Sequence, residues 1–477
     1  MGIQIGPSNI QDIDGILWGW CWQWNNGDHA VLTYSFPTSR QVYLDQGYAD
    51  VQGFQAFNAK QKAAAEKVLA NYDAVCNLDF VFTADPYQGN IRFAEASYFD
   101  DGNGFQNVND TAFGFAPDNA IIAPWTQGDT WYNNPDAAPG ENYNSPIPGN
   151  HAYTAGLLHE VGHAVGLKHG HEGQPVFNLD LSVAYTNPAL PANHDSQEYS
   201  VMTYRAYPGA ALAITPEEYP STLMQDDILA LQYLYGANYD HNDGNTTYKW
   251  NPKTGAMSIN GQSQGETYHG KIFLTVWDGG GVDTYDFSNY DTNATIRLDP
   301  GAWSTPSNAQ RADLHLGAQE HLARGCIANA RYWEGDLRPL IENAIGGSGN
   351  DKITGNQVDN KLTGGRGSDT LTGKSGNDRF DFNSIKDSAV GGKRDVITDF
   401  KRGQDLIDLK GIDAKTGSND QKFTWIGKQG FHDEKGELRL IDKGASCIVQ
   451  GDVDGDGKAD FEILVKVGLL GASDFLL

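Results

Sequence analysis

Four contiguous nine-residue repeats at 346–381 constrain the fold of this chain most. They read GGSGNDKIT, GNQVDNKLT, GGRGSDTLT and GKSGNDRFD. A repeat of fixed length indicates stacked copies of one small unit, each of which buries its apolar side against its neighbours. Glycine supplies 56 of the 477 residues, which suits a segment built from tight turns. The repeats therefore predict an all-β unit, because a plain Gly- and Asp-rich linker would not keep this register.

Each repeat follows the pattern G-G-x-G-x-D-x-U-x, in which U is a large apolar residue. The sixth position offers a side-chain oxygen for Ca²⁺, and the eighth would fill the core of a parallel β-roll. The second repeat departs from the pattern at Val358 and Asn360, which puts in doubt a calcium site that uses it. The predicted calcium-binding residues are Gly346, Gly347, Gly349, Asp351, Asn360, Gly364, Gly365, Gly367, Asp369, Gly373, Gly376 and Asp378, followed by Asp399 and Asp408 beyond the repeats.

A second constraint is the string HEVGHAVGLKH, which begins at His159. On a helix the spacing of four brings His159 and His163 to one face, where two imidazoles can bind one zinc ion. Gly166 can adopt a positive φ, end the helix and turn the chain back, so that His169 becomes a third ligand. Three protein ligands leave the fourth position for water, as in catalytic zinc sites. Glu160, beside the first ligand, could take the proton from that water.

The extended pattern H-E-x-x-H-x-x-G-x-x-H resembles that of the metzincin metalloproteases, in which a methionine-containing turn follows. Residues 200–204, SVMTY, match this turn. Met202 resembles the apolar floor of the metzincin zinc site. Tyr204 resembles the tyrosine that ligates zinc in astacins and serralysins and swings away, so its phenol could then donate to the developing oxyanion. His171 could compete as a ligand, but the spacing favours His169.

The zinc string together with the calcium repeats resembles the serralysin family of secreted bacterial metalloendopeptidases. One departure is Gly170, where many relatives have proline. The resemblance implies an α+β metzincin catalytic domain at 1–245, with a twisted mixed sheet and three main helices, followed by an all-β calcium-bound parallel β-roll or sandwich domain at 246–477. Further segments that carry the likeness are TYSFPTS (33–39), DTWYN (129–133), DDILALQYLYGAN (226–238) and IENAIGGSGND (341–351).

The same resemblance implies a zinc-dependent endopeptidase with one catalytic Zn²⁺ and several structural Ca²⁺ ions. Residues 395–408 and the final ASDFLL look like the C-terminal domain of serralysins and its uncleaved type I secretion signal. The beginning, MGIQIGPSNIQDIDG, has no pattern of a secretory signal peptide, so we expect export to depend on the C-terminal end. The implied partners are protein and peptide substrates, the type I secretion machinery and a proteinaceous inhibitor, and we expect a monomer.

The charge balance excludes other classes of protein. The 34 Lys and Arg residues stand against 61 Asp and Glu residues, a formal net charge of −27. Such a surface repels phosphate backbones and anionic lipids, so we expect neither nucleic-acid binding nor stable membrane association. The segment at 451–462 resembles an EF-hand loop, but the twelfth position counted from Asp452 is Ile463 instead of glutamate, so we do not expect tight calcium binding there.

Hydrophobic periodicity predicts the elements of the first half of the chain. The four tryptophans of 18–24 alternate with a period of two, which is typical of a half-buried strand; the alternative is a removable segment that lies over a cleft. We expect a substrate to pair in extended form with an edge strand near 90–98, with broad sequence preference because the backbone leads the binding. The predicted strands are 32–38, 79–84, 90–98 and 119–125, and the predicted helices are 54–72, 152–167 and 223–235.

Two competing hypotheses remain. A calcium-dependent binding protein with an inert protease half would explain the repeats alone. It would not explain the full set of zinc-site residues that accompanies them. An astacin- or matrixin-like protease would explain the zinc site, but it would not explain the repeats, and the chain has no P-R-C-G cysteine-switch string.

Overall fold

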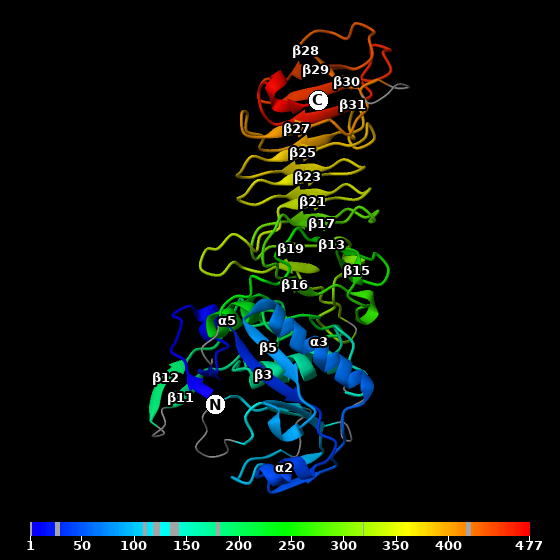
Figure 1. The fold of residues 1–477 in the computed structure, drawn as a ribbon. Helices are drawn as coiled ribbons and strands as arrows, with labels where there is room; N and C mark the ends of the chain where they lie inside the picture. The colour runs from blue at the N-terminus through cyan, green and yellow to red at the C-terminus, as the bar shows by residue number, and fades with distance from the viewer. Residues whose placement is uncertain are drawn as a thin grey trace.

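The computed structural model describes residues 2–23, 29–107, 112–117, 125–133, 143–177, 182–317, 319–415 and 421–477. The chain forms an elongated molecule, with the helices in the N-terminal half and a column of short strands in the C-terminal half (Figure 1). The predicted combination of mixed sheets, few helices and a large β-rich C-terminal region is confirmed. Within the described residues, no helix is both long and apolar enough to cross a membrane.

A five-stranded sheet forms the centre of the N-terminal half. It is parallel except for its last strand, and its order is β5 (Leu78–Phe82), β3 (Ala30–Ser35), β6 (Ile91–Glu95), β10 (Asp129–Tyr132) and β9 (Ala112–Gly114). The strand predicted at 90–98 is divided, because β7 (Tyr98–Asp100) leaves this sheet to pair with β4 (Asp50–Gln52) and β8 (Gln106–Asn107). The prediction that this segment forms an edge is wrong, since β6 lies between β3 and β10 and every one of its residues is buried. The two edge strands of this sheet are β5 and β9.

Three main helices pack around this sheet. Helix α3 (Ala59–Val75) begins later than predicted, because the Asn58 side chain accepts hydrogen bonds from the amides of Lys60 and Gln61 and caps the helix there. The second helix starts as a π-helix, η2 (Ala152–Leu158), and continues as α4 (His159–Ala164). The third main helix is α5 (Gln225–Tyr235). The shorter helices of the described residues are α1 (Gln11–Asp14) and α2 (Gln41–Gln46), with the 3₁₀ turns η1 (Pro86–Gln88), η3 (Tyr268–Gly270), η4 (Asn308–Gln310) and η5 (Ala472–Asp474).

The N-terminal segment is built into the core. Strand β1 (Gly2–Gln4) pairs with β2 (Trp20–Trp22), which is the described part of the strand predicted at 18–24. Between them, Ile16 and Leu17 are at most 1% exposed. Such burial favours a structural role for the segment over a removable cover. The next strands after the histidine string, β11 (Gln174–Phe177) and β12 (Val183–Asn187), pair antiparallel with each other. The strand predicted at 119–125 lies almost wholly outside the described residues.

Successive repeats of the C-terminal half alternate between two facing sheets (Figure 1). Strand partners are eighteen residues apart, as in the pairing of Asn343 with Lys361 and of Lys361 with Arg379. One turn of the roll therefore uses two nine-residue repeats. One sheet contains β15 (Gln262–Ser263), β14 (Met257–Ile259), β13 (Thr247–Trp250), β17 (Thr284–Asp286), β21 (Asn343–Ile345), β23 (Lys361–Thr363), β25 (Arg379–Asp381), β27 (Leu406–Asp408) and β32 (Phe475–Leu476). The other contains β18 (Thr295–Arg297), β22 (Lys352–Thr354), β24 (Thr370–Thr372), β26 (Asp395–Ile397), β31 (Phe461–Val465), β30 (Cys447–Asp452), β29 (Glu437–Asp442) and β28 (Thr424–Gly427).

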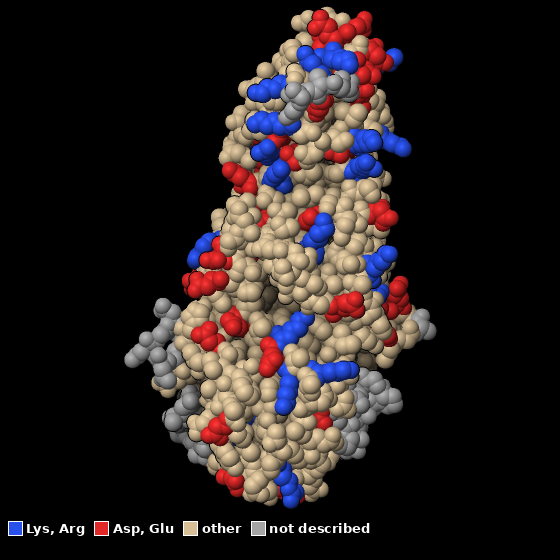
Figure 2. All heavy atoms as spheres, turned by 45° about the vertical axis from the view of Figure 1, so that its right-hand side comes forward, with Lys and Arg blue, Asp and Glu red and all other residues tan. Residues whose placement is uncertain are grey.

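The apolar residue at the eighth position of each repeat fills the space between these sheets. Ile353, Leu362, Leu371 and Phe380 are all 0% exposed and belong to one core cluster. This alternation of inward and outward side chains is what a β-roll of the predicted kind requires. At the far tip of this half, around β28–β31, Figure 2 shows a gathering of Asp and Glu side chains.

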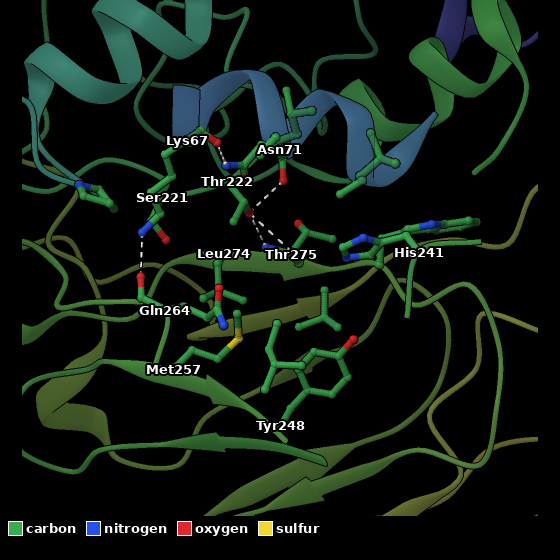
Figure 3. Close-up of a pocket in the computed structure, with 18 of the residues that line it drawn as sticks. Lys67, Asn71, Ser221, Thr222, His241, Tyr248, Met257, Gln264, Leu274 and Thr275 are labelled. Carbon is green, nitrogen blue, oxygen red and sulfur yellow. Dashed lines mark hydrogen bonds between the residues drawn. The ribbon is translucent and has the colours of Figure 1, made fainter. Parts of the chain in front are cut away.

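The two halves pack closely against each other. A small sheet of β16 (Leu274–Val276), β20 (Ile327–Asn329) and β19 (Trp303–Ser304) lies at the junction, and Phe273 and Trp277 belong to the core of the N-terminal half. A boundary at 245 between two domains stays a prediction. A pocket of 240 Å³ opens between α3 and strands β13, β14 and β16 (Figure 3), and Figure 2 shows a hollow in the face where the halves meet.

Candidate metal centre

Three imidazoles converge beside α4. The Nε2 atoms of His159 and His163 lie 3.1 Å apart, those of His163 and His169 3.1 Å, and those of His169 and His159 3.2 Å. The first two residues share a helix face, and the third returns to them after the chain turns at Gly166, whose φ is +105°. The fold therefore brings together the three histidines that the sequence spacing predicted to share one site.

Hydrogen bonds determine which nitrogen of each ring faces its neighbours. Nδ1 of His159 donates to the carbonyl of Val201 at 2.8 Å, and Nδ1 of His163 donates to the carbonyl of Leu167 at 2.9 Å. Because a carbonyl only accepts, the proton of each neutral ring is on Nδ1 and the Nε2 lone pair points to the centre. Burial, followed by the neighbouring imidazoles, lowers the pKa of His159 and His163 to about 3 and that of His169 to about 2.

The trio fits a zinc ion. Tetrahedral Zn–N bonds of about 2.0–2.1 Å would place the ligand nitrogens about 3.3 Å from one another, close to the separations found. Two lone pairs on neutral rings at 3.1 Å repel unless a cation lies between them. His171 is adjacent to this centre, with its ring centroid 5.3 Å from that of His169, but its nitrogens are outside the 3.2 Å triangle.

A methionine lies directly beneath the metal-binding helix. Met202 is 0% exposed, and a Cβ on Gly162 would lie 2.5 Å from its sulfur atom. The same Cβ would lie 3.1 Å from the hydroxyl of Tyr72 in α3. Glycine at this helical position therefore allows the thioether to approach the helix backbone, and sequence reasoning had named Met202 without its partner Gly162.

A buried carboxylate that sequence reasoning missed holds the turn around Met202. Asp227, in the first turn of α5, accepts hydrogen bonds from the Ser200 hydroxyl at 2.6 Å, the Val201 amide at 2.8 Å and the Met224 amide at 2.9 Å. Burial raises the pKa of Asp227 to about 7. Val201 also accepts the hydrogen bond from His159, so Asp227 acts on the metal centre through one intervening residue.

A buried lysine holds the loop that carries the third histidine. The ammonium of Lys168 donates to the carbonyls of Gly15, Glu172 and Pro188 at 2.5, 2.7 and 3.0 Å, and to that of His169 at 3.2 Å. It thereby joins the N-terminal segment to the loop. Burial lowers the pKa of Lys168 to about 8. This role of Lys168 could hardly be predicted from the sequence, because a lysine beside a histidine indicates nothing unusual.

A cleft of 490 Å³ opens over the three histidines. Glu160 lines it and is 6% exposed, and the Tyr204 hydroxyl lies 2.9 Å from Nε2 of His169. Edge strand β9 forms another wall, and a Cβ on Gly114 would overlap the carbonyl oxygen of Glu160. A carboxylate, a phenol and an edge strand thus line the cleft around the three histidines.

Carboxylates form rows along the β-roll. The Asp351 amide donates to Asp369, and the Asp369 amide donates to Asp395, at 2.7 and 2.8 Å. Oδ2 of Asp369 and Oδ2 of Asp395 are buried and have no hydrogen-bond partner among the described residues. Burial raises the pKa of Asp369 to about 8 and that of Asp395 to about 9. Stacked, buried carboxylates of this kind are stabilised by protonation or by a cation, and Ca²⁺ is a cation that fits their hard oxygen atoms.

The opposite turns of the roll carry a second row. The Asn360 amide donates to Asp378 at 3.0 Å, and the Asp378 amide donates to Asp405 at 3.1 Å. Asp405 and Asp395 were absent from the predicted set, since both follow insertions that break the nine-residue period. The glycines of the repeats stack closely, and a Cβ on Gly367, where φ is +134°, would overlap the carbonyl oxygen of Gly349.

The two calcium-binding residues predicted beyond the repeats contact different groups: one accepts backbone amides and the other is ion-paired. Asp399 accepts the amides of Gly373 and Lys374 at 2.9 and 2.8 Å, so it caps a turn of the repeats. Asp408 is ion-paired with Arg379.

Two further acidic clusters lie in the C-terminal half. Asp278, Asp283 and the half-buried Glu342 form a cluster that sequence reasoning missed, in which the Asp283 amide donates to Glu342 at 2.7 Å. In the EF-hand-like loop, Asp452, Asp454 and Asp460 have oxygen atoms within 4.8 Å of one another.

Comparison with known proteins places the chain among metallopeptidases. The family described as "Peptidase M10 serralysin C terminal" matches residues 237–308 and 336–477. The chain is 31% identical to Metallopeptidase AprA of Pseudomonas marginalis over 465 residues, which cover 93% of this chain and 85% of that protein. It is 33% identical to Serralysin G of Dickeya chrysanthemi (81% and 74% covered) and 32% identical to Serralysin of Photorhabdus luminescens (86% and 76% covered). A solved subunit of the Azotobacter vinelandii mannuronan C5-epimerase, AlgE6R2, covers 41% of this chain and is itself 91% covered, at 20% identity, with a TM-score of only 0.23.

Proposed function

The chain belongs to the serralysin family of metallopeptidases, and we propose that it is a secreted zinc-dependent endopeptidase of broad specificity. The family membership predicted from the motifs is thereby confirmed. The observation that carries the proposal is the convergence of three Nε2 lone pairs in a cleft that also contains Glu160 and Tyr204. In this proposal His159, His163 and His169 hold the zinc ion, and Tyr204 is a further ligand that can leave.

The side chains of the cleft have separate roles in peptide hydrolysis. A bound zinc ion supplies Lewis acidity, which polarises a carbonyl group and makes water more acidic. Glu160 accepts the proton of the attacking water and returns it to the leaving amine. The Tyr204 phenol donates a hydrogen bond to the oxyanion as it forms. The Nδ1 hydrogen bonds to Val201 and Leu167 keep two imidazoles in the orientation that the chemistry needs.

The substrate lies along β9 instead of β6. β9 is one of the two edge strands of the sheet, and it is the one that forms a wall of the cleft, so an extended peptide can add to it as a further strand. Main-chain hydrogen bonds of this kind select little among side chains. Broad specificity therefore follows from the position of the edge.

Calcium has a structural role in this proposal. Ions bound by the repeats from Gly346 to Asp378 would neutralise the buried carboxylates of the roll, which are otherwise too costly to assemble. A chain of net charge −27 would then fold only where calcium is abundant, outside the cell. Export through a type I machinery that reads the C-terminal end, and inhibition by a small protein, remain part of the proposal on the strength of the family alone.

The test is cleavage of a denatured protein by the calcium-refolded chain. Glu160→Gln removes the base but keeps the shape of the side chain, so kcat should fall by roughly a hundredfold to ten-thousandfold while one zinc remains bound. The matched control is Glu66→Gln, on the exposed side of α3, which should retain full activity. Removal of zinc by a chelator should abolish cleavage, and added zinc should restore it.

An inert wild-type chain that contains one zinc ion and folded repeats would refute the proposal and favour a calcium-dependent binding protein. Undiminished cleavage by Glu160→Gln would refute the role of the carboxylate alone.

A further inference from the structure

A second concave surface, of 780 Å³, lies at the edge of the β-roll, apart from the catalytic cleft. Its floor is formed by edge strand β18 and by β19, which are joined by a bridge between Thr295 and Thr305. We call this surface the basic groove, because Arg297, Arg311, Arg324 and Lys374 line it. None of these residues belongs to the catalytic site.

The charge of the basic groove is opposite to that of the whole chain. Four cations line it, and the carboxylates that they contact are Asp299 and Glu198. Asp299 is shared, since both Arg297 and Lys374 are ion-paired with it. The groove therefore keeps an excess of about two positive charges in a chain whose formal net charge is −27. Such a local excess attracts anions that the rest of the surface repels.

Two of the three guanidinium groups are held in place before any ligand arrives. Arg311 donates from Nε to the carbonyl of Ala323 at 2.6 Å and from Nη2 to the carbonyl of Leu322 at 3.3 Å. Arg324 donates to Glu198 at 3.1 Å and lies over the ring of Tyr199. Neutral carbonyls orient Arg311 without cancelling its charge, so its remaining N–H groups can bind a carboxylate at little entropic cost.

One loop links the basic groove to the catalytic cleft. It leaves the groove after Arg311 and returns at Arg324, and in between the Leu316 amide donates to the carbonyl of Thr215 at 2.7 Å. Thr215 lines the catalytic cleft. In the same loop the Asp313 carbonyl accepts the amide of Glu217 at 3.0 Å. The wall of the cleft therefore continues directly into the segment that positions two of the four cations.

From this continuity and this charge we propose that the basic groove is an exosite for an acidic segment of a protein substrate. Carboxylates of that segment pair with Arg297, Arg311 and Lys374 while another part of the same substrate lies in the cleft. The inference rests on the proposed function, and it adds a preference to the broad specificity of the cleft: polypeptides with runs of Asp or Glu are bound more tightly and cut faster than others. Guanidinium groups match carboxylates through paired hydrogen bonds, which gives the groove its selectivity.

Binding is measured first, on the calcium-loaded full chain carrying Glu160→Gln, so that the probe is not cut. The probe is a short fluorescent peptide of alternating Asp and Gly. The double variant Arg297→Gln and Lys374→Gln should raise its Kd roughly tenfold, and added salt should weaken binding to the parent. The matched control, Lys393→Gln with Lys410→Gln, removes the same charge from exposed positions of the roll outside the groove and should leave Kd unchanged.

Activity then separates the exosite from the proposed function. With Glu160 restored, the groove variant should lose about the same factor in kcat/KM on a substrate that carries an acidic tail, and nothing on the same substrate without the tail. Equal loss on both substrates, or equal weakening by the control pair, would overturn the exosite. Binding of polygalacturonate in place of the peptide would also overturn it and assign the groove to acidic sugars. If the peptide binds the groove but no substrate is cut, the anion site stands and the proposed function fails.

Discussion

Replacement of Asp227 tests whether hydrogen bonds from α5 hold the methionine turn and, through it, the metal centre. Oδ2 of Asp227 accepts the amides of Val201 and Met224 at 2.8 and 2.9 Å, and Oδ1 accepts the Ser200 hydroxyl at 2.6 Å. Asp227→Ala removes all three acceptor contacts. Asp227→Asn keeps the two amide contacts through its carbonyl oxygen, and its NH₂ group can donate to the Ser200 hydroxyl, which reverses the direction of the third hydrogen bond.

The magnitude follows from the number of donors left without a partner. Asp227 is 0% exposed, so in the Ala variant the two amides and the hydroxyl would stay buried and unsatisfied. Each such group costs about 1–3 kcal/mol, so the Ala variant should lose about 4 kcal/mol of unfolding free energy after partial relaxation. The Asn variant should be as stable as the wild type within about 1 kcal/mol, or more stable, because burial opposes the charge of Asp227.

The assay is urea unfolding of the calcium-saturated protein, followed by tryptophan fluorescence, together with the rate of zinc transfer to a chelator. The Ala variant should also release zinc faster, since Val201 accepts the hydrogen bond that orients His159. A loss below about 1 kcal/mol in the Ala variant would refute the reasoning. An Asn variant as unstable as the Ala variant would show that the charge, and not the hydrogen bonding, is what matters.

Three further predictions concern the same site. Burial raises the pKa of Asp227 to about 7, above its value of about 4 in the unfolded chain, so its contribution to stability is complete below about pH 4 and is lost as the pH rises through about 7. The free energy of unfolding of the wild type, relative to that of Asp227→Asn, should therefore fall between about pH 4 and about pH 7. A difference that stays constant with pH would contradict the shift. Lys168→Met leaves four carbonyls without their shared donor and should lower the free energy of unfolding by about 3 kcal/mol. It should also speed the loss of zinc to a chelator, and unchanged zinc release would show that Lys168 does not hold the third ligand in place. Gly114→Ala places a Cβ against the backbone of Glu160 and should lower kcat/KM by roughly tenfold with zinc retained, so full activity on protein substrates would argue against β9 as the wall of the working cleft.

The sequence alone determined the features that depend on local spacing. Nine-residue periodicity predicted the strands of the roll and the buried row from Ile353 to Phe380, because each repeat specifies its own turn and its own inward side chain. A spacing of four on a helix similarly predicted that His159 and His163 share a face. Gly166 could be singled out because only a residue free to adopt a positive φ can turn the chain there.

The tertiary structure alone decided which distant segments support these local features. The sequence places Asp227 on a helix, but only packing of α5 against the turn at 200–204 makes it a buried acceptor. Strand order is equally non-local: the sequence predicted an edge at 90–98, but β6 lies between β3 and β10, and the edge strand at the cleft is β9. The basic groove joins β18 to a turn of the repeats more than seventy residues later. Periodicity describes what one segment buries, whereas partners far apart in the chain are set by how whole elements pack.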